Sequence, residues 1–150
     1  MTVQVISAFF AILAFSVVNN VPKKFLLYCG LEGSVGWFVY LIFLPAQGAV
    51  MANFFGSLAL AIMAYVFARV FKAPVTVFLF PGLLILVPGA GLFRSAYQLF
   101  LGTKDMAAFY MLQTLEIAGM IALAVFVVDS FFSVINKKRR DLEELHAEKK

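Results

Sequence analysis

The sequence predicts an all-α integral membrane protein of about five transmembrane helices. Hydrophobic residues make up 63% of the chain and charged residues only 13%, whereas a soluble domain carries about 25% charged residues. A soluble fold of 150 residues has too little interior to hide this apolar surface, so the bilayer is the expected solvent. The fourth apolar segment contains two Pro-Gly pairs, which predicts a broken helix.

Five apolar segments alternate with short polar or basic stretches, and each is near or above the roughly 20 residues that a spanning helix needs. The segments run from Val3 to Val18, Phe25 to Leu44, Gly48 to Phe71, Val75 to Leu101 and Met106 to Val134. We therefore predict a transmembrane domain over residues 1–135 and a charged cytoplasmic tail over residues 136–150. In the tail, i,i+4 pairs of opposite charge predict that the last helix continues into the cytosol. These pairs are Lys137/Asp141, Arg139/Glu143 and Arg140/Glu144.

The basic residues indicate how the chain is oriented. Lys23 and Lys24 follow the first segment, Lys72 follows the third, and the Lys137–Arg140 cluster follows the fifth. With five spans, all of these positions lie on one side, and cytoplasmic loops are the ones enriched in Lys and Arg. The expected topology in the cell (inner or cytoplasmic) membrane has the N-terminus outside and the C-terminus in the cytoplasm. A four-span alternative, with a re-entrant fourth segment, would put the terminal cluster on the wrong side.

The composition excludes several kinds of site. One cysteine, Cys29, and one histidine, His146, cannot assemble a Cys/His metal site or a His-based catalytic set. We therefore expect no metal, no cofactor and no enzymatic activity. The net charge is +4. The basic residues that produce it flank apolar runs and form no patch on a folded surface, so nucleic acid is not an expected partner.

The fourth segment carries the strongest local signal. Each proline removes a backbone donor and clashes with the preceding turn, and in lipid the freed carbonyls need partners in protein or in a water-lined cavity. Pro81 alone indicates a kink. The run from Pro88 to Gly91 predicts a half-helix that starts near Gly91 with unpaired amides, and such an N-terminus attracts carboxylates. A proline kink without function is the competing interpretation.

Three ionisable residues inside apolar segments are singled out as functional candidates, because charges at this depth are costly. The helical rise places Arg94 about 12 Å and Glu116 about 18 Å from the turn at Gly102, so we predict an Arg94–Glu116 pair. Glu32 lies about 12 Å from Lys24 and has no evident partner. It is a candidate to bind a proton, face a second subunit or mark a pathway. A buried structural pair or a snorkelling side chain is the alternative for all three.

The candidate site residues fall into three groups. The substrate-binding candidates are Arg94, Gly89, Gly91 and Gln98; the proton-coupling candidates are Glu116 and Glu32; the structural break is assigned to Pro81 and Pro88. Further polar residues lie in or near the spans, where an interhelical hydrogen bond is the simpler role. They are Asn53, Ser57, Gln113 and Thr114.

The stretch from Pro81 to Tyr97, PGLLILVPGAGLFRSAY, resembles the signature of the threonine/serine exporter family. That signature is a proline, a few apolar residues, then Pro-Gly and an aromatic-Arg step, here Phe93-Arg94. Asn20-Val21-Pro22 before a glycine-rich helix also resembles it. The family's usual tyrosine is Phe93 in this chain, so any role of that hydroxyl is lost, and some split members lack the arginine.

The resemblance implies an expected architecture. A full exporter of this family has ten helices in two five-helix halves, and this chain is similar to the C-terminal half made as a separate protein. A larger membrane subunit resembling the N-terminal half is therefore an implied partner, and a homo-oligomer is a further option.

The resemblance also implies a function: a subunit of a secondary membrane transporter that exports small carboxylate solutes. These are threonine/serine-like amino acids or dicarboxylates such as succinate. The absence of a nucleotide-binding loop favours the proton gradient as the energy source. The alternative is a non-transporting assembly or stabilising subunit of a larger membrane complex, and a membrane enzyme is poorly served by these residues.

Overall fold

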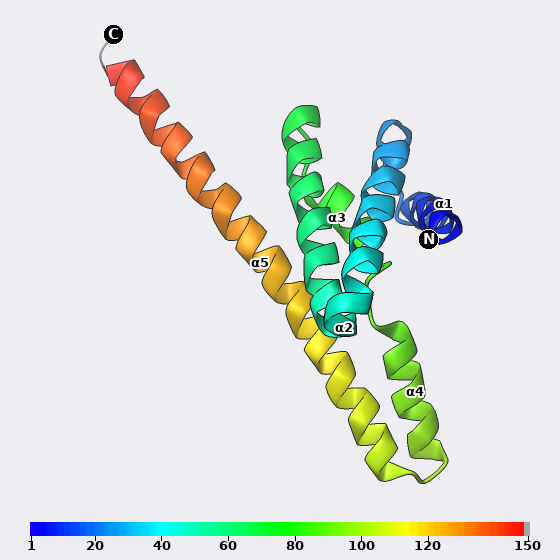
Figure 1. The fold of residues 1–150 in the computed structure, drawn as a ribbon. Helices are drawn as coiled ribbons and strands as arrows, with labels where there is room; N and C mark the ends of the chain where they lie inside the picture. The colour runs from blue at the N-terminus through cyan, green and yellow to red at the C-terminus, as the bar shows by residue number, and fades with distance from the viewer. Residues whose placement is uncertain (149–150) are drawn as a thin grey trace.

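The computed structural model describes the backbone of residues 1–148 and the side chains of residues 1–138, and it is all-α as predicted. The predicted charge pairs of the tail involve side chains outside this range. The elements are α1 (Thr2–Val18), η1 (Lys23–Phe25), α2 (Leu26–Phe71), α3 (Thr76–Leu83), α4 (Gly89–Phe100) and α5 (Lys104–Glu148). Figure 1 shows α5 as the longest straight helix, with α4 beside its first half and α2 folded beside its middle.

The second and third predicted segments form the two arms of α2, which folds back on itself (Figure 1). The reversal lies at Gly48, whose φ of 77° and ψ of 174° are non-helical. Glycine adopts a positive φ without steric cost. The prediction that the helix stops at Pro45 is wrong: the first arm continues past this proline, because one missing amide weakens a helix without forcing the chain to reverse.

Glycine also lets the two arms of α2 approach closely. A Cβ atom on Gly56 would lie 3.0 Å from the carbonyl oxygen of Gly36. Small residues at such a crossing allow two helix backbones to pack tightly in a membrane. The paired arms are the support on which α1, α3 and α5 rest.

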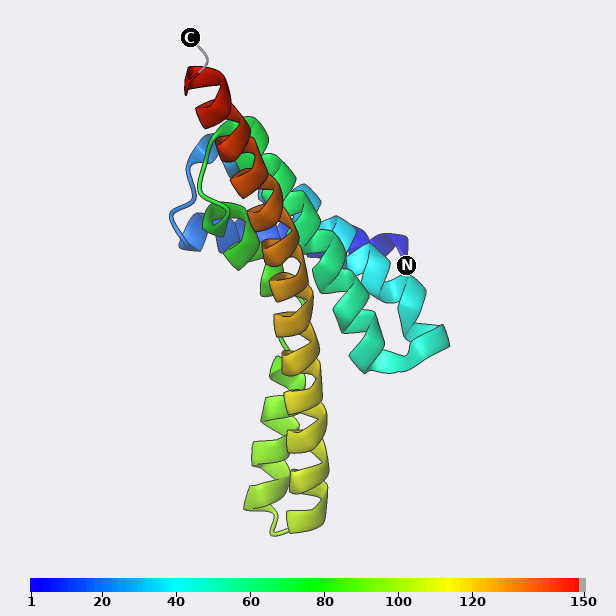
Figure 2. The same ribbon diagram turned by 90° about the vertical axis from the view of Figure 1, so that its left-hand side faces the viewer.

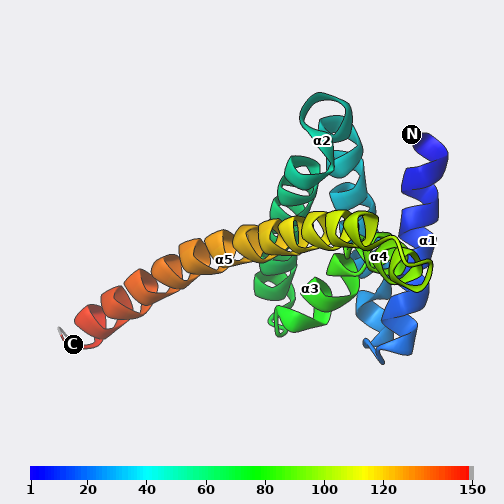
Figure 3. The same ribbon diagram turned by 90° about the horizontal axis from the view of Figure 1, so that it is seen from below.

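A small aromatic-rich core joins α1, α2 and α3. Phe25 and Phe78 pack with ring centroids 5.2 Å apart, and Cys29 is fully buried beside them. Pro81 has no N–H for the carbonyl of Val77, and the Cys29 thiol donates to that oxygen at 3.7 Å. Figure 3 shows α1 alongside α2 and α5 crossing the bundle.

The fourth predicted segment is broken, as expected. α3 ends at Leu83 and α4 begins at Gly89, two residues before the predicted start at Gly91. The earlier start follows from the Pro88 carbonyl, which accepts a hydrogen bond from the Leu92 N–H at 3.2 Å. Pro81 remains inside α3, near its end.

Polar contacts join the last part of α2 to the middle and second half of α5. The Tyr65 hydroxyl donates to Asp129, and Arg69 donates to Asn136. The Tyr65 ring also stacks on Phe132, with centroids 4.8 Å apart. Asp129 lies within the fifth apolar segment but was not among the predicted ionisable residues. Its role here is to hold α5 against the second arm of α2.

The helices α4 and α5 form an antiparallel pair, which Figure 2 shows side by side down to their connecting turn. The Ser95 hydroxyl is buried and donates to the carbonyl oxygen of Ala107 at 3.0 Å. This bond fixes the two helices at a defined register near the turn.

Two helices in the described part are long and apolar enough to cross a membrane, over Lys23–Phe71 and Lys104–Lys138; α1 is a shorter apolar helix. Both ends of α2 and the last turns of α5 lie towards the same end of the molecule, opposite the α4–α5 turn (Figures 1 and 2). Lys23, Lys24 and Lys72 flank those ends of α2. This arrangement agrees with the prediction that the basic residues lie on one side of the membrane. The number of membrane-spanning helices stays a prediction.

Candidate functional site

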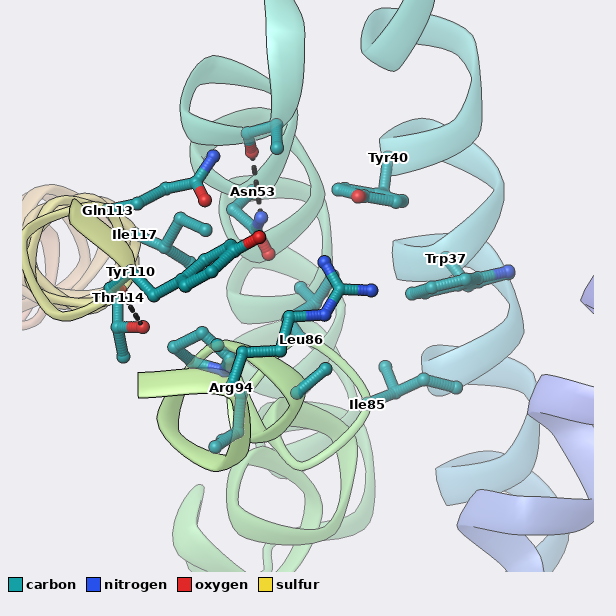
Figure 4. Close-up of a pocket in the computed structure, with 15 residues that line it drawn as sticks. Trp37, Tyr40, Asn53, Ile85, Leu86, Arg94, Tyr110, Gln113, Thr114 and Ile117 are labelled. Carbon is teal, nitrogen blue, oxygen red and sulfur yellow. Dashed lines mark hydrogen bonds between the residues drawn. The ribbon is translucent and has the colours of Figure 1, made fainter. Parts of the chain in front are cut away.

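A cavity of about 320 Å³ lies at the break between α3 and α4. Both arms of α2, the connecting residues 85–88, α4 and α5 all contribute to its wall (Figure 4). Its volume is at the lower end of the range of about 300–1,000 Å³ for ligand sites, and small solutes fit such a space. The cavity is therefore the candidate site.

Arg94 is the one cationic side chain in the wall of this cavity, within the described residues. It projects from α4 between Tyr110 on α5 and the aromatic residues of the first arm of α2 (Figure 4). Its guanidinium carbon lies 5.9 Å from the centroid of the Tyr110 ring. A guanidinium held by an aromatic face keeps its N–H groups available for an oxyanion.

The first turn of α4 adds backbone donors. Ala90 and Gly91 line the cavity, and no backbone acceptor is found for their amides in the described part of the chain. Unpaired first-turn amides and the helix dipole together favour a bound anion. The predicted convergence of free amides and Arg94 at the break is thus present in the structure.

The opposite wall is formed by α2. Trp37 and Tyr40 on the first arm stack with ring centroids 4.8 Å apart. Asn53 on the second arm is 5% exposed, and its Nδ2 donates to the Ala49 carbonyl at 2.7 Å. This bond orients the Asn53 side chain, whose oxygen is drawn beside Tyr110 and Arg94 in Figure 4.

Gly91 is required by the approach of α4 to α5. A Cβ atom at this position would lie 2.3 Å from the Thr114 hydroxyl oxygen. That hydroxyl already donates to the Tyr110 carbonyl at 2.7 Å. Gly91 therefore serves both the close helix contact and the exposure of its own amide.

The two remaining substrate-binding candidates, Gln98 and Gly89, are not among the residues that line the cavity. Gln98 is further along α4. Its side-chain oxygen Oε1 and its backbone carbonyl oxygen accept hydrogen bonds from the Thr103 hydroxyl at 2.6 and 2.9 Å, respectively. Its role is to close the α4–α5 turn, so the structure does not support the predicted contact with substrate. Gly89 begins α4 and flanks the wall, with no atom within 4 Å of a Cβ built on it.

The predicted Arg94–Glu116 pair is wrong. Residues 110, 113, 114 and 117 of α5 face the cavity. At about 100° per residue, Glu116 lies roughly 110° around the helix from the centre of that face. It is exposed, and no described residue forms an ion pair with it. Similar depth in two helices does not make their side chains face each other.

Glu32 occupies a different environment. Its side chain is fully buried, and neither carboxyl oxygen has a hydrogen-bond partner in the described structure. A Cβ atom on Gly82 would lie 2.9 Å from Oε1, so the carboxyl group rests against the end of α3. It does not line the cavity.

Sequence reasoning missed the aromatic part of the wall. Trp37, Tyr40 and Tyr110 lie in apolar segments that contain many aromatic residues, and nothing in their spacing distinguishes them. Asp129 had a usable signal, because it is an acidic residue within an apolar run.

A bundle of apolar helices around a small, mainly apolar cavity with a few polar groups at a broken helix is the architecture of a membrane protein that binds a small solute. The chain belongs to the threonine/serine exporter family, because the family model described as Threonine/Serine exporter, ThrE matches residues 4–131. The family is one of transporters, so membership indicates a role in amino-acid export and not an enzyme. No curated protein and no solved structure gives a significant match.

Proposed function

We propose that this chain is one subunit of a secondary exporter of small amino acids, and that the cavity at the α3–α4 break is its substrate site. The observation that carries the proposal is the convergence of Arg94 with the free amides of Ala90 and Gly91 on one cavity. The guanidinium and the amides would hold the substrate carboxylate.

The charges of the wall favour an amino acid over a dicarboxylate such as succinate. A dicarboxylate would bring a second anionic group, and the described wall contains one cation, Arg94. The ammonium group of an amino acid would instead meet aromatic faces and amide oxygens. On the α2 side, the aromatic faces belong to Trp37 and Tyr40 and the amide oxygen to Asn53.

A partner subunit, resembling the N-terminal half of a full exporter, is part of the proposal. Glu116 is exposed on the face of α5 that turns away from the cavity, in a helix apolar enough to span a membrane. A charged side chain facing lipid is costly, so we expect another protein surface to cover it. Export would use the proton gradient, with Glu32 as the stronger proton-coupling candidate and Glu116 as the weaker one.

The test uses the complex that co-purifies with the tagged chain from its native membrane, reconstituted into proteoliposomes. We expect radiolabelled serine and threonine to be transported by the complex and not by this chain alone. Competition by succinate without competition by either amino acid would contradict the substrate assignment. Full transport by the isolated chain would contradict the partner. If the complex transports, and loss of Arg94 changes nothing, the chain is a stabilising subunit.

The proposed topology, with the N-terminus outside and the C-terminus in the cytoplasm, is tested with reporters. Because the basic ends of α2 and the last turns of α5 lie at one end of the molecule, a C-terminal fluorescent protein should fluoresce. A C-terminal alkaline phosphatase should be inactive. An active phosphatase at this position would reject the five-span arrangement.

A further inference from the structure

We propose that the charge on Glu32 controls the contact between α2 and the end of α3, and through it the shape of the cavity at Arg94. This inference rests on the proposed function, because it assigns a regulating group to the same site. It follows from where Glu32 lies, from what surrounds it and from how α3 is connected to the cavity.

The surroundings of Glu32 suit an uncharged carboxyl group. The side chain is fully buried without a hydrogen-bond partner for either oxygen, within the described structure. α1 and α3 contain no acidic or basic residue at all. On the second arm of α2, Tyr65 and Arg69 are engaged with α5. On the first arm of α2, the Tyr28 hydroxyl and the Cys29 thiol belong to titratable residues one helical turn before Glu32. A carboxylate here would lack any donor, and such a burial is costly.

The contact with α3 is direct. Glu32 Oε1 lies against Gly82, and Leu60 of the second arm packs on the same glycine, 3.0 Å from a Cβ built there. Earlier in α3, the Cys29 thiol holds the Val77 carbonyl. Cys29 and Glu32 lie three residues apart on the same helix, so they share the face of α2 that supports α3.

The end of α3 is connected to the cavity wall by only a few residues. The Gly82 carbonyl accepts from the Ile85 amide at 3.4 Å, and the Leu83 carbonyl accepts from the Leu86 amide at 2.9 Å. Ile85 and Leu86 then line the cavity. A displacement of Gly82 therefore moves part of the wall.

The resulting device has two forms. With the proton on its carboxyl oxygen, Glu32 packs against Gly82 and the cavity has the shape seen here. When the O–H bond breaks, the proton passes to water and the carboxylate keeps the electron pair. The carboxylate then needs hydrogen-bond donors, which are gained when α3 moves off α2 and water enters. One proton thereby alters the site of the carboxylate substrate.

The sole cysteine of the chain provides a test that does not depend on transport. Cys29 is fully buried under α3, so its reaction with a membrane-permeant maleimide reports the opening of this contact. From about pH 6 to about pH 9, labelling of the wild-type complex should rise about fivefold more than labelling of Glu32→Gln. The Gln variant contains the same thiol without a neighbouring carboxylate that opposes its ionisation, so thiol ionisation does not explain a larger rise in the wild type. Asp105→Asn, a carboxyl loss at the α4–α5 turn, should behave as wild type.

Gly82→Ala is a second, independent variant. Its methyl group would lie 2.9 Å from Glu32 Oε1 and 3.0 and 3.1 Å from the two Leu60 Cδ atoms. Because Leu60 is fully buried and blocks the same space, the methyl group should push α3 off α2 and make Cys29 reactive even at low pH. The inference is overturned if wild type and Glu32→Gln show the same pH dependence, or if Gly82→Ala stays protected. Labelling that differs as expected, in a complex that moves no amino acid, would reject the proposed function and keep this inference.

Discussion

Arg94→Ala is expected to weaken amino-acid binding by about 10- to 100-fold, which corresponds to about 1.5–3 kcal/mol for hydrogen bonds to a charged group. The guanidinium is the one cation in the described cavity wall, so no neighbouring group can replace it. Arg94→Lys should lose less binding affinity, because lysine keeps the positive charge but cannot form the planar, bidentate hydrogen bonds to a carboxylate. Equilibrium binding of labelled serine to the purified complex measures both effects.

Lys104→Ala is the matched control for the loss of a cation, because Lys104 lies at the start of α5 beside the turn. Its binding constant should stay at the wild-type value. Since Glu116 faces away from the cavity, Glu116→Ala should not rescue Arg94→Ala. Rescue by the double change would show that Arg94 serves a structural pair, and unchanged binding by Arg94→Ala alone would remove it from the site.

Gly91→Ala is expected to destabilise the protein by about 1–3 kcal/mol, the usual cost of forcing extra volume into a packed contact. The added Cβ would lie 2.3 Å from the Thr114 hydroxyl oxygen, so α4 must move away from α5. The movement also shifts the Gly91 amide and Arg94, and serine binding should fall with stability. The melting temperature of the purified complex in detergent measures the first effect.

Thr114→Ala provides the rescue in this case. The Thr114 Cβ lies 3.5 Å from the position of the new methyl group, an ordinary contact, so removal of the hydroxyl relieves the clash. Gly91→Ala combined with Thr114→Ala should therefore recover most of the melting temperature. Gly119→Ala on α5, where no atom lies within 4 Å of the added Cβ, is the neutral control. An equally low melting temperature in the double variant would show that the clash is not the cause.

Depth along a helix was predictable, and direction around its axis was not. Arg94 and Glu116 were placed at similar depths by counting residues at about 1.5 Å each. Their pairing failed because the face of α5 that meets α4 contains Thr114, which fits against Gly91, and Ala107, which accepts a hydrogen bond from Ser95, and does not contain Glu116. Such a fit depends on two surfaces, and a single segment does not contain that information.

Gln98 and Glu32 illustrate the same distinction at two positions. Gln98 is one turn after Arg94, yet it accepts hydrogen bonds from Thr103 at the turn and does not line the cavity. Glu32 was expected to be unusual because it is an acid in an apolar segment. Its burial against Gly82 depends on where α3 docks, which neither segment indicates.

By itself the sequence determined the all-helical class, the apolar segments and the break that ends at Pro88, because apolar composition and a missing proline N–H act locally. It also identified Arg94 as a functional candidate, because a charged residue inside an apolar segment is costly. The tertiary structure alone decided that Trp37, Tyr40 and Asn53 complete the cavity, and that Glu116 lies outside it. Those outcomes depend on how closely helices approach at Gly36, Gly56 and Gly91, and the approach sets which faces meet.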